Sequence, residues 1–167
     1  GCRAELPALP PSCPLEVSGR SQFKLFVNGQ SVHFGPCRGE KEIAYVDSLD
    51  VAPYLRAGEN RLAFQVFSYP EHPGEEEGPY HCFGDGGGPA FSVTGRLGDL
   101  DLAEPASWRA WLDIGQGFNR HQIFMMGCSE TVDGAKAGEN PFFQKAWPET
   151  GRLPVAVGEG GGVVPCG

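Results

Sequence analysis

The stretch DVAPYLRAGENRLAFQVFSY, residues 50–69, ends in a clear β-strand pattern. From Arg61 onward, apolar side chains recur at every second position, which is typical of a strand with one well-buried face. The two predicted faces carry Leu62, Phe64 and Val66 on one side and Ala63, Gln65 and Phe67 on the other.

The first half of this stretch predicts a turn that leads into the strand. Asp50 is placed to cap a single helical or 3₁₀ turn, and Pro53 suits the first turn of such an element. Gly58 then ends the turn and reverses the chain. The whole stretch therefore predicts a scaffold unit that positions backbone and carries no chemistry of its own.

Outward from this unit, the segment 22–35 predicts a β-hairpin. Alternating apolar residues stand on both sides of Asn28-Gly29, and both of these residues tolerate the positive φ angles of a type I′ turn. Further strands are predicted at 43–49, 89–97, 107–114 and 121–133, and the irregular segment after them has one short apolar run at 155–157.

Short strands separated by turn signals, without a long helical pattern, predict an all-β fold, a β-sandwich or jelly roll. The proline-rich residues 1–20 predict an extended lead-in, residues 21–160 the sandwich, and residues 161–167 a glycine-rich tail.

Composition sets limits on the class of partner. The 167 residues include 25 glycines and 15 prolines, but also 11 Phe, 4 Tyr and 3 Trp, which are enough to build a core. The net charge of −8 argues against nucleic acid and against an anionic membrane surface. Apolar runs are far shorter than the roughly 20 residues of a membrane helix, so no membrane span is expected.

Six cysteines are scattered without a C-x-x-C pair, which makes a zinc site improbable. Cys2 and Cys13 either close a terminal loop as a disulfide or are buried free thiols. The chain begins without Met, which fits a processed product, a cloning remnant at Gly1 or a piece of a longer protein. Gly1-Cys2 also fits the junction of a cleaved lipoprotein signal.

No catalytic motif stands out. The glycine run 84–88 lacks the G-K-[ST] sequence of a phosphate-binding loop, and His121 has no nucleophile elbow to serve. Acidic residues are many, but none is singled out as half of a catalytic carboxylate pair. We therefore expect no catalytic residues in this chain.

Binding residues are easier to nominate. Trp108 and Trp111 lie three apart and should face opposite sides of a strand, so at least one of them should face away from the core side. Trp111 is the one chosen as the candidate. With Tyr80 and the loop around Asp85 it forms the candidate carbohydrate-binding set, because sugar C–H faces pack on aromatic rings. Asp85, Asp99 and Asp101 lie near glycines and are candidates for a structural calcium ion, the one cofactor considered.

The order of motifs resembles a known family. FKLFVNGQSVHFGPCRGE, YVDSLDVAPYLRAGENRLAFQV, PAFSVTGRL, PASWRA and SETVDGAKAG are similar to the N-terminal β-sandwich of bacterial α-L-rhamnosidases of glycoside hydrolase family 78. The likeness covers about residues 22–135. Its scaffold positions are Asn28, Gly29, Gly35, Pro36, Arg38, Asp50, Tyr54, Leu55, Gly58, Asn60 and Trp108.

The resemblance implies an all-β, jelly-roll β-sandwich of the galactose-binding-like type. It also implies a non-catalytic accessory domain, because the catalytic residues of that family lie in a separate helical barrel. Such a domain would support a catalytic domain of the same polypeptide or bind glycan weakly, and we expect it to be extracellular, periplasmic or at the cell surface. Two alternatives stay open: an autonomous carbohydrate-binding module, and a structural or adhesive surface domain held by disulfides.

Overall fold

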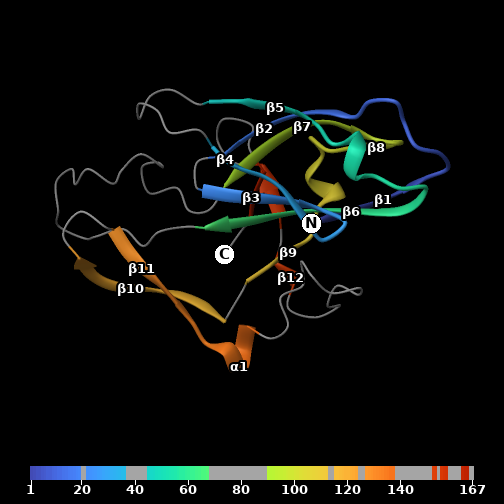
Figure 1. The fold of residues 1–167 in the computed structure, drawn as a ribbon. Helices are drawn as coiled ribbons and strands as arrows, with labels where there is room; N and C mark the ends of the chain where they lie inside the picture. The colour runs from blue at the N-terminus through green and yellow to red at the C-terminus, as the bar shows by residue number, and fades with distance from the viewer. Residues whose placement is uncertain are drawn as a thin grey trace.

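The computed structural model is built almost wholly from antiparallel strands packed as two main sheets (Figure 1). The structure describes residues 1–19, 22–36, 45–67, 90–112, 115–123, 127–137, 152–153, 155–157 and 163–165. Among these residues no helix has the length and apolar character needed to cross a membrane.

The first main sheet has four strands in the order β1-β6-β3-β4. Their bounds are β1 Cys2–Leu6, β6 Gly58–Phe67, β3 Gln22–Val27 and β4 Gln30–Gly35.

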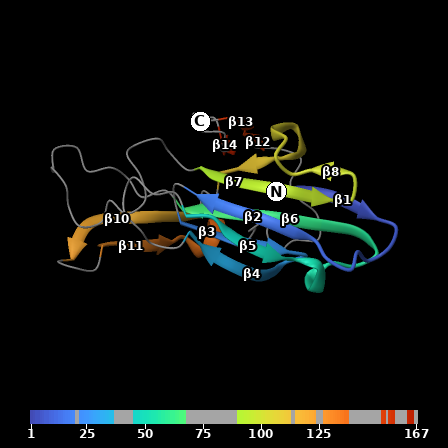
Figure 2. The same cartoon turned by 90° about the horizontal axis from the view of Figure 1, so that it is seen from above.

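The second main sheet has the order β13-β14-β7-β2-β5, and β8 pairs with β7 beside it. Its strands are β13 Val155–Val157, β14 Val163–Pro165, β7 Phe91–Leu97, β2 Pro14–Gly19, β5 Asp47–Asp50 and β8 Leu100–Asp101. Seen from above, β7, β2 and β5 lie over β6, β3 and β4 (Figure 2). The all-β, two-sheet prediction is therefore confirmed.

Smaller elements complete the described structure. Two two-stranded pairs join β9 (Ala110–Trp111) to β12 (Arg152–Leu153) and β10 (Gln116–Ile123) to β11 (Gly127–Val132). Helical turns are η1 Ala52–Tyr54, η2 Pro105–Ser107 and α1 Gly134–Ala137.

The predicted hairpin is confirmed between β3 and β4. Asn28 has φ 52° and Gly29 has φ 82°, the positive values that a primed two-residue turn needs. The side-chain amide of Asn28 donates to the Tyr54 carbonyl at 2.9 Å, and its oxygen accepts from the Arg61 N–H at 3.1 Å. The turn is thus tied to β6 as well as to its own strands.

The predicted turn before β6 is also present, with one correction. The residue at the N-cap of η1 is Val51, not Asp50. The Asp50 carboxylate instead accepts from the backbone N–H of Ala52 at 2.9 Å and of Cys13 at 2.8 Å, which ties the turn to the segment before β2. Gly58 has φ 91° and reverses the chain as predicted.

The core lies between the two sheets and follows the alternation of the strands. Leu62 and Phe64 of β6 point inward, as predicted, and are at most 6% exposed. The Phe64 ring stacks on Phe91 of the opposite sheet, with centroids 4.3 Å apart and planes at 15°. Trp108 is 3% exposed and packs against both rings. Each such side chain contributes roughly 1.5–3 kcal/mol through burial.

Residues 1–20, predicted as an extended lead-in, supply β1 and β2 of the two sheets. Cys2, Leu6, Leu15 and Val17 are each at most 3% exposed. Leu15 and Val17 alternate with exposed residues, which is the pattern of a strand. The prolines earlier in the segment argue against strand pairing, so the sequence did not predict this strand.

Three strand predictions need revised bounds. In place of 43–49, the described strand is β5; Ile43 lies outside the described residues. In place of 107–114, the chain has η2 and the two-residue β9, because the Trp108 indole N–H donates to the Leu102 carbonyl at 2.8 Å and holds this residue in the core. In place of one strand at 121–133, β10 and β11 form an antiparallel pair.

Candidate functional site

The outer face of the four-stranded sheet carries the residues most suited to binding. We use "outer face" for the side of this sheet turned away from the core. Its side chains follow from the strand registers: Gln22, Lys24 and Phe26 of β3, Phe34 of β4, Ala63, Gln65 and Phe67 of β6, with Trp111 of β9 packed against them.

Trp111 lies on this outer face. Its side chain is half-buried and packs on Phe26 and Ala63, which are 5% and 4% exposed and form a small cluster separate from the main core. Trp108, three residues earlier, belongs to the main core. The two indoles therefore lie on opposite sides of the four-stranded sheet, but not on one strand as predicted, because Trp108 precedes β9.

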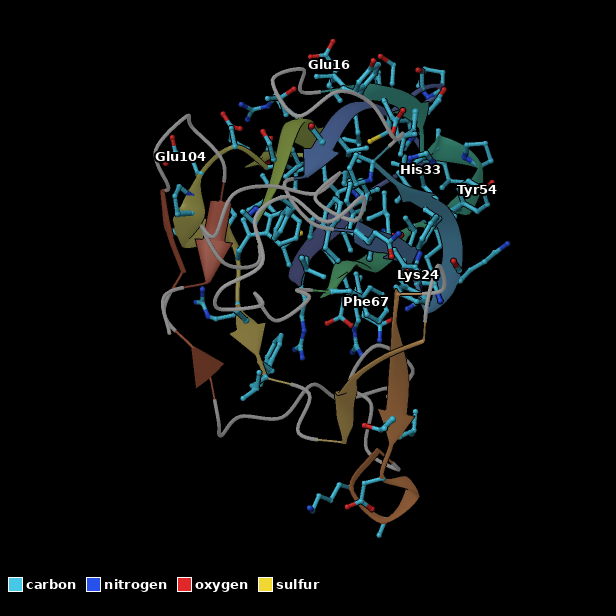
Figure 3. The ribbon with its side chains drawn as sticks, turned by 90° about the vertical axis from the view of Figure 1, so that its left-hand side faces the viewer. Glu16, Lys24, His33, Tyr54, Phe67 and Glu104 are labelled. Atoms are coloured by element: carbon cyan, nitrogen blue, oxygen red, sulfur yellow. The ribbon has the colours of Figure 1, made fainter. Side chains whose placement is uncertain are left out.

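Lys24 and Phe67 form the second part of the outer face. The Lys24 ammonium lies 5.7 Å from the centroid of the Phe67 ring, within the range of a cation–π contact. Figure 3 shows both residues on the side of the sandwich opposite to Glu16, which projects from β2 in the other sheet. The cation is thus held over an aromatic ring at the outer surface.

Phe34 extends the aromatic character of this face. It is the register partner of Lys24 on β4, so both side chains leave the sheet on the same side. Phe34 is 56% exposed, which is unusual for a large apolar side chain. Gln65 is the register partner of Lys24 on its other side and adds an amide group.

Arg61 is a cation that β6 places on the outer face, and a neighbouring carboxylate holds it. Arg61 donates from Nε to Glu59 Oε1 at 2.8 Å, and its Nη2 lies 2.6 Å from the same oxygen. Arg61 and Lys24 therefore differ in their described contacts: one has a carboxylate partner and the other an aromatic ring.

Lys24, Phe34, Gln65 and Phe67 were missed as candidate site residues. Of these residues, the sequence pattern places only Gln65 and Phe67 on a predicted strand face, the one opposite to Leu62 and Phe64. Their proximity depends on the pairing of β3 with β6, whose residues are about forty positions apart in the chain. No local sequence signal reports that pairing.

The remaining predicted site residues are not brought to this face by the described structure. Tyr80 and Asp85 lie outside the described residues. Asp99 and Asp101 lie at the turn between β7 and β8, and the Asp101 carboxylate accepts from the Ala103 N–H at 3.0 Å. Within the described part of the chain, no group of three or more His, Cys, Asp and Glu side chains is placed to hold a metal ion.

A half-buried acid–base pair lies elsewhere, at the open edge of the sandwich. His33 Nε2 of β4 is 3.0 Å from Asp47 Oδ2 of β5, and the side chains are 24% and 25% exposed. The pair joins the edge strand of one sheet to the edge strand of the other. His121, considered above as a base, lies on β10, and its side chain is outside the described set.

The cysteine alternatives are resolved for two of the six residues. Cys2 and Cys13 are buried free thiols, so the predicted Cys2–Cys13 disulfide is wrong and the alternative holds. Burial raises the pKa of the Cys2 thiol to about 12. Burial, and then the nearby Asp50 carboxylate, raise the pKa of Cys13, whose thiol donates to the Arg96 carbonyl at 3.3 Å.

Comparisons with protein-family models, with curated proteins and with solved structures give no match for this chain. The case for function therefore rests on the geometry of the outer face and on the motifs in the sequence.

Proposed function

We propose that this chain is a non-catalytic accessory β-sandwich of a carbohydrate-active, α-L-rhamnosidase-like hydrolase, and that it binds glycan weakly on its outer face. The observation that carries the proposal is the position of Trp111, a half-buried indole packed on Phe26 and Ala63 outside the core. Aromatic side chains in such positions offer the flat apolar surface on which the C–H face of a sugar ring packs.

We propose further that the fold is a jelly roll of the galactose-binding-like type. Strand β2 pairs with β7 and β3 pairs with β6, so the pairs are nested in the chain. Strands β4 and β5 follow at the inner end of this nest and approach each other through His33 and Asp47. A hairpin ribbon wrapped around a two-layer core produces this nesting, which supports the jelly-roll type.

Calorimetry on the purified chain tests glycan binding. Rhamnose- and galactose-containing oligosaccharides should give heats that fit a Kd in the millimolar range, or about −4 kcal/mol. Trp111→Ala should remove the signal. Leu112→Ala is the matched control, because Leu112 is 71% exposed beside Trp111 and its loss should change little. Equal heats for wild type and Trp111→Ala would refute the proposal.

A separate assay tests the proposal that the chain is non-catalytic. An aryl-rhamnoside substrate should not be hydrolysed by the chain beyond the rate of a contaminant control. Turnover above that control would overturn the assignment as an accessory domain.

Support of a catalytic domain is the second candidate function, and the exposed Phe34 favours it. A 56% exposed phenyl ring on a sheet face is a suitable contact for another domain of the same polypeptide. If this role is the right one, Phe34→Ser should leave the stability of the isolated chain nearly unchanged. The same change should lower the thermal stability of a protein that also contains the catalytic domain.

A further inference from the structure

Lys24 differs from Arg61, Arg96 and Lys136, each of which has a carboxylate partner. Arg61 has Glu59 within 2.6 Å, Arg96 has Asp101 at 3.9 Å and Lys136 has Asp133 at 3.1 Å. In the described part of the chain, Lys24 has no carboxylate within ion-pair distance. This is notable in a protein with 21 acidic residues against 13 Lys and Arg.

The surroundings of Lys24 hold its ammonium in place without neutralising it. The side chain is half-buried, and Nζ lies over the Phe67 ring at 5.7 Å from the centroid. A ring face attracts the cation but leaves its N–H donors available for an oxyanion. Restricting the side chain beforehand also lowers the entropy that a ligand must overcome.

Lys24 lies on the same face of the sheet as the residues that carry Trp111. Trp111 packs on Phe26, which is two residues from Lys24 on the same strand and the same face. The Lys24 ammonium lies over Phe67, the register partner of Gln22, so it is displaced from Phe26 by about four residues, or roughly 13 Å along the strand. An oligosaccharide that stacks one ring at Trp111 can therefore direct a charged substituent of a neighbouring ring toward Nζ.

We infer that the glycan bound at Trp111 carries a singly charged oxyanion, a carboxylate or a sulfate ester, that pairs with the Lys24 ammonium. This inference rests on the proposed function and adds the chemical class of the ligand. The net charge of −8 opposes the approach of an anion at long range, so Lys24 gives selectivity at short range. Phe34 is the register partner of Lys24 on β4 and adds an exposed aromatic side chain to the same face.

The test compares three oligosaccharides of equal length by calorimetry: a galacturonan, a sulfated galactan and a neutral galactan. Wild type should bind at least one charged oligosaccharide fivefold or more tighter than the neutral one, and the favoured anion identifies the source of the charge. Lys24→Gln should reduce that preference to twofold or less, while Lys24→Arg should keep most of it. Lys136→Gln, which changes an exposed lysine on α1, is the control and should bind as wild type.

The outcomes separate the inference from the proposed function. Equal affinity for charged and neutral oligosaccharides, or a preference that survives in Lys24→Gln, overturns the inference; loss of binding in Trp111→Ala would still uphold the proposed function. Absence of binding to all three overturns the inference, while Trp111-dependent binding of a neutral rhamnose-containing oligosaccharide would still uphold the proposed function. A second measurement raises the ionic strength to about 1 M, where the Debye length is about 3 Å; the wild-type preference should vanish while binding of the neutral oligosaccharide persists. Circular dichroism on each variant establishes that it is folded.

Discussion

His33 on β4 and Asp47 on β5 meet at 3.0 Å and link the two sheets at their open edge. The two strands belong to different sheets, so this contact is a polar connection between the layers. Because both side chains are about one quarter exposed, solvent screens the pair and its contribution should be modest.

A double-mutant cycle measures this link. We expect His33→Gln, Asp47→Asn and the double variant to reveal a coupling free energy of about 0.5–1 kcal/mol in urea unfolding. Strict additivity of the two single changes would mean that the contact does not stabilise the sandwich edge.

Gly35 packs against the same pair, and a side chain there should be costly. An added Cβ would lie 2.8 Å from Cζ of Phe23, 3.0 Å from Asp47 Oδ2 and 3.2 Å from His33 Nε2. Phe23 is fully buried and has little room to move. We expect Gly35→Ala to lower the free energy of unfolding by about 1–3 kcal/mol.

Gly134 is the control for that substitution. A Cβ at this glycine would meet nothing within 4 Å, so Gly134→Ala should change stability by less than about 0.5 kcal/mol. Similar losses at the two glycines, measured by urea unfolding, would contradict the packing argument.

Asn60 should be the most sensitive polar residue of the scaffold. It is fully buried, and its amide donates to the carbonyls of Arg56 at 2.6 Å and Gly58 at 2.9 Å. Its oxygen accepts from the Arg56 N–H at 2.9 Å and from Asn28 at 2.9 Å. Asn60→Asp keeps the shape but places a carboxylate against two carbonyl oxygens, which should cost more than about 2 kcal/mol.

Glu59 precedes Asn60 in the chain but lies at the surface, so substituting it should cost little stability. Glu59→Gln removes the ion pair with Arg61, but the Glu59 side chain is 42% exposed, so the loss should stay below about 1 kcal/mol. If thermal unfolding shows that the two variants lose equal stability, then the burial of Asn60 is not what matters.

Features that depend on neighbouring residues in the chain could be predicted from the sequence, whereas contacts between strands that are distant in the chain could not. The turn, the Asn28-Gly29 hairpin and the inward face of β6 were predictable because each depends on neighbours within a few residues. The support of Trp111 by Phe26 and Ala63 was not, since it joins three strands distant in the chain. The position of Lys24 over Phe67 could not be predicted for the same reason, because it depends on the pairing of β3 with β6.

Asp50 should make the free energy of unfolding decrease as the pH falls in the acidic range. Hydrogen bonds from the Cys13 and Ala52 N–H groups and the Ser12 hydroxyl hold its pKa below the ordinary value of 3.8. A lowered folded-state pKa gives stability that is fully present above about pH 4 and is lost as the pH falls through the folded pKa. The difference in unfolding free energy between wild type and Asp50→Asn should therefore shrink as the pH is lowered from about 5 to about 2. A constant difference across that range would rule out Asp50 as the source.

Cys2 should make the free energy of unfolding decrease as the pH rises in the alkaline range. Its thiol is 2% exposed in β1, and burial raises its pKa from the ordinary 9.0 to about 12. A raised folded-state pKa gives stability that is fully present below about pH 9 and is lost as the unfolded chain ionises above it. Cys2→Ala should therefore flatten the loss of stability between about pH 8 and pH 10. Mapping of thiol labelling by mass spectrometry checks the burial directly: Cys2 should label only in denaturant, and rapid labelling in the folded chain would contradict its place in the core.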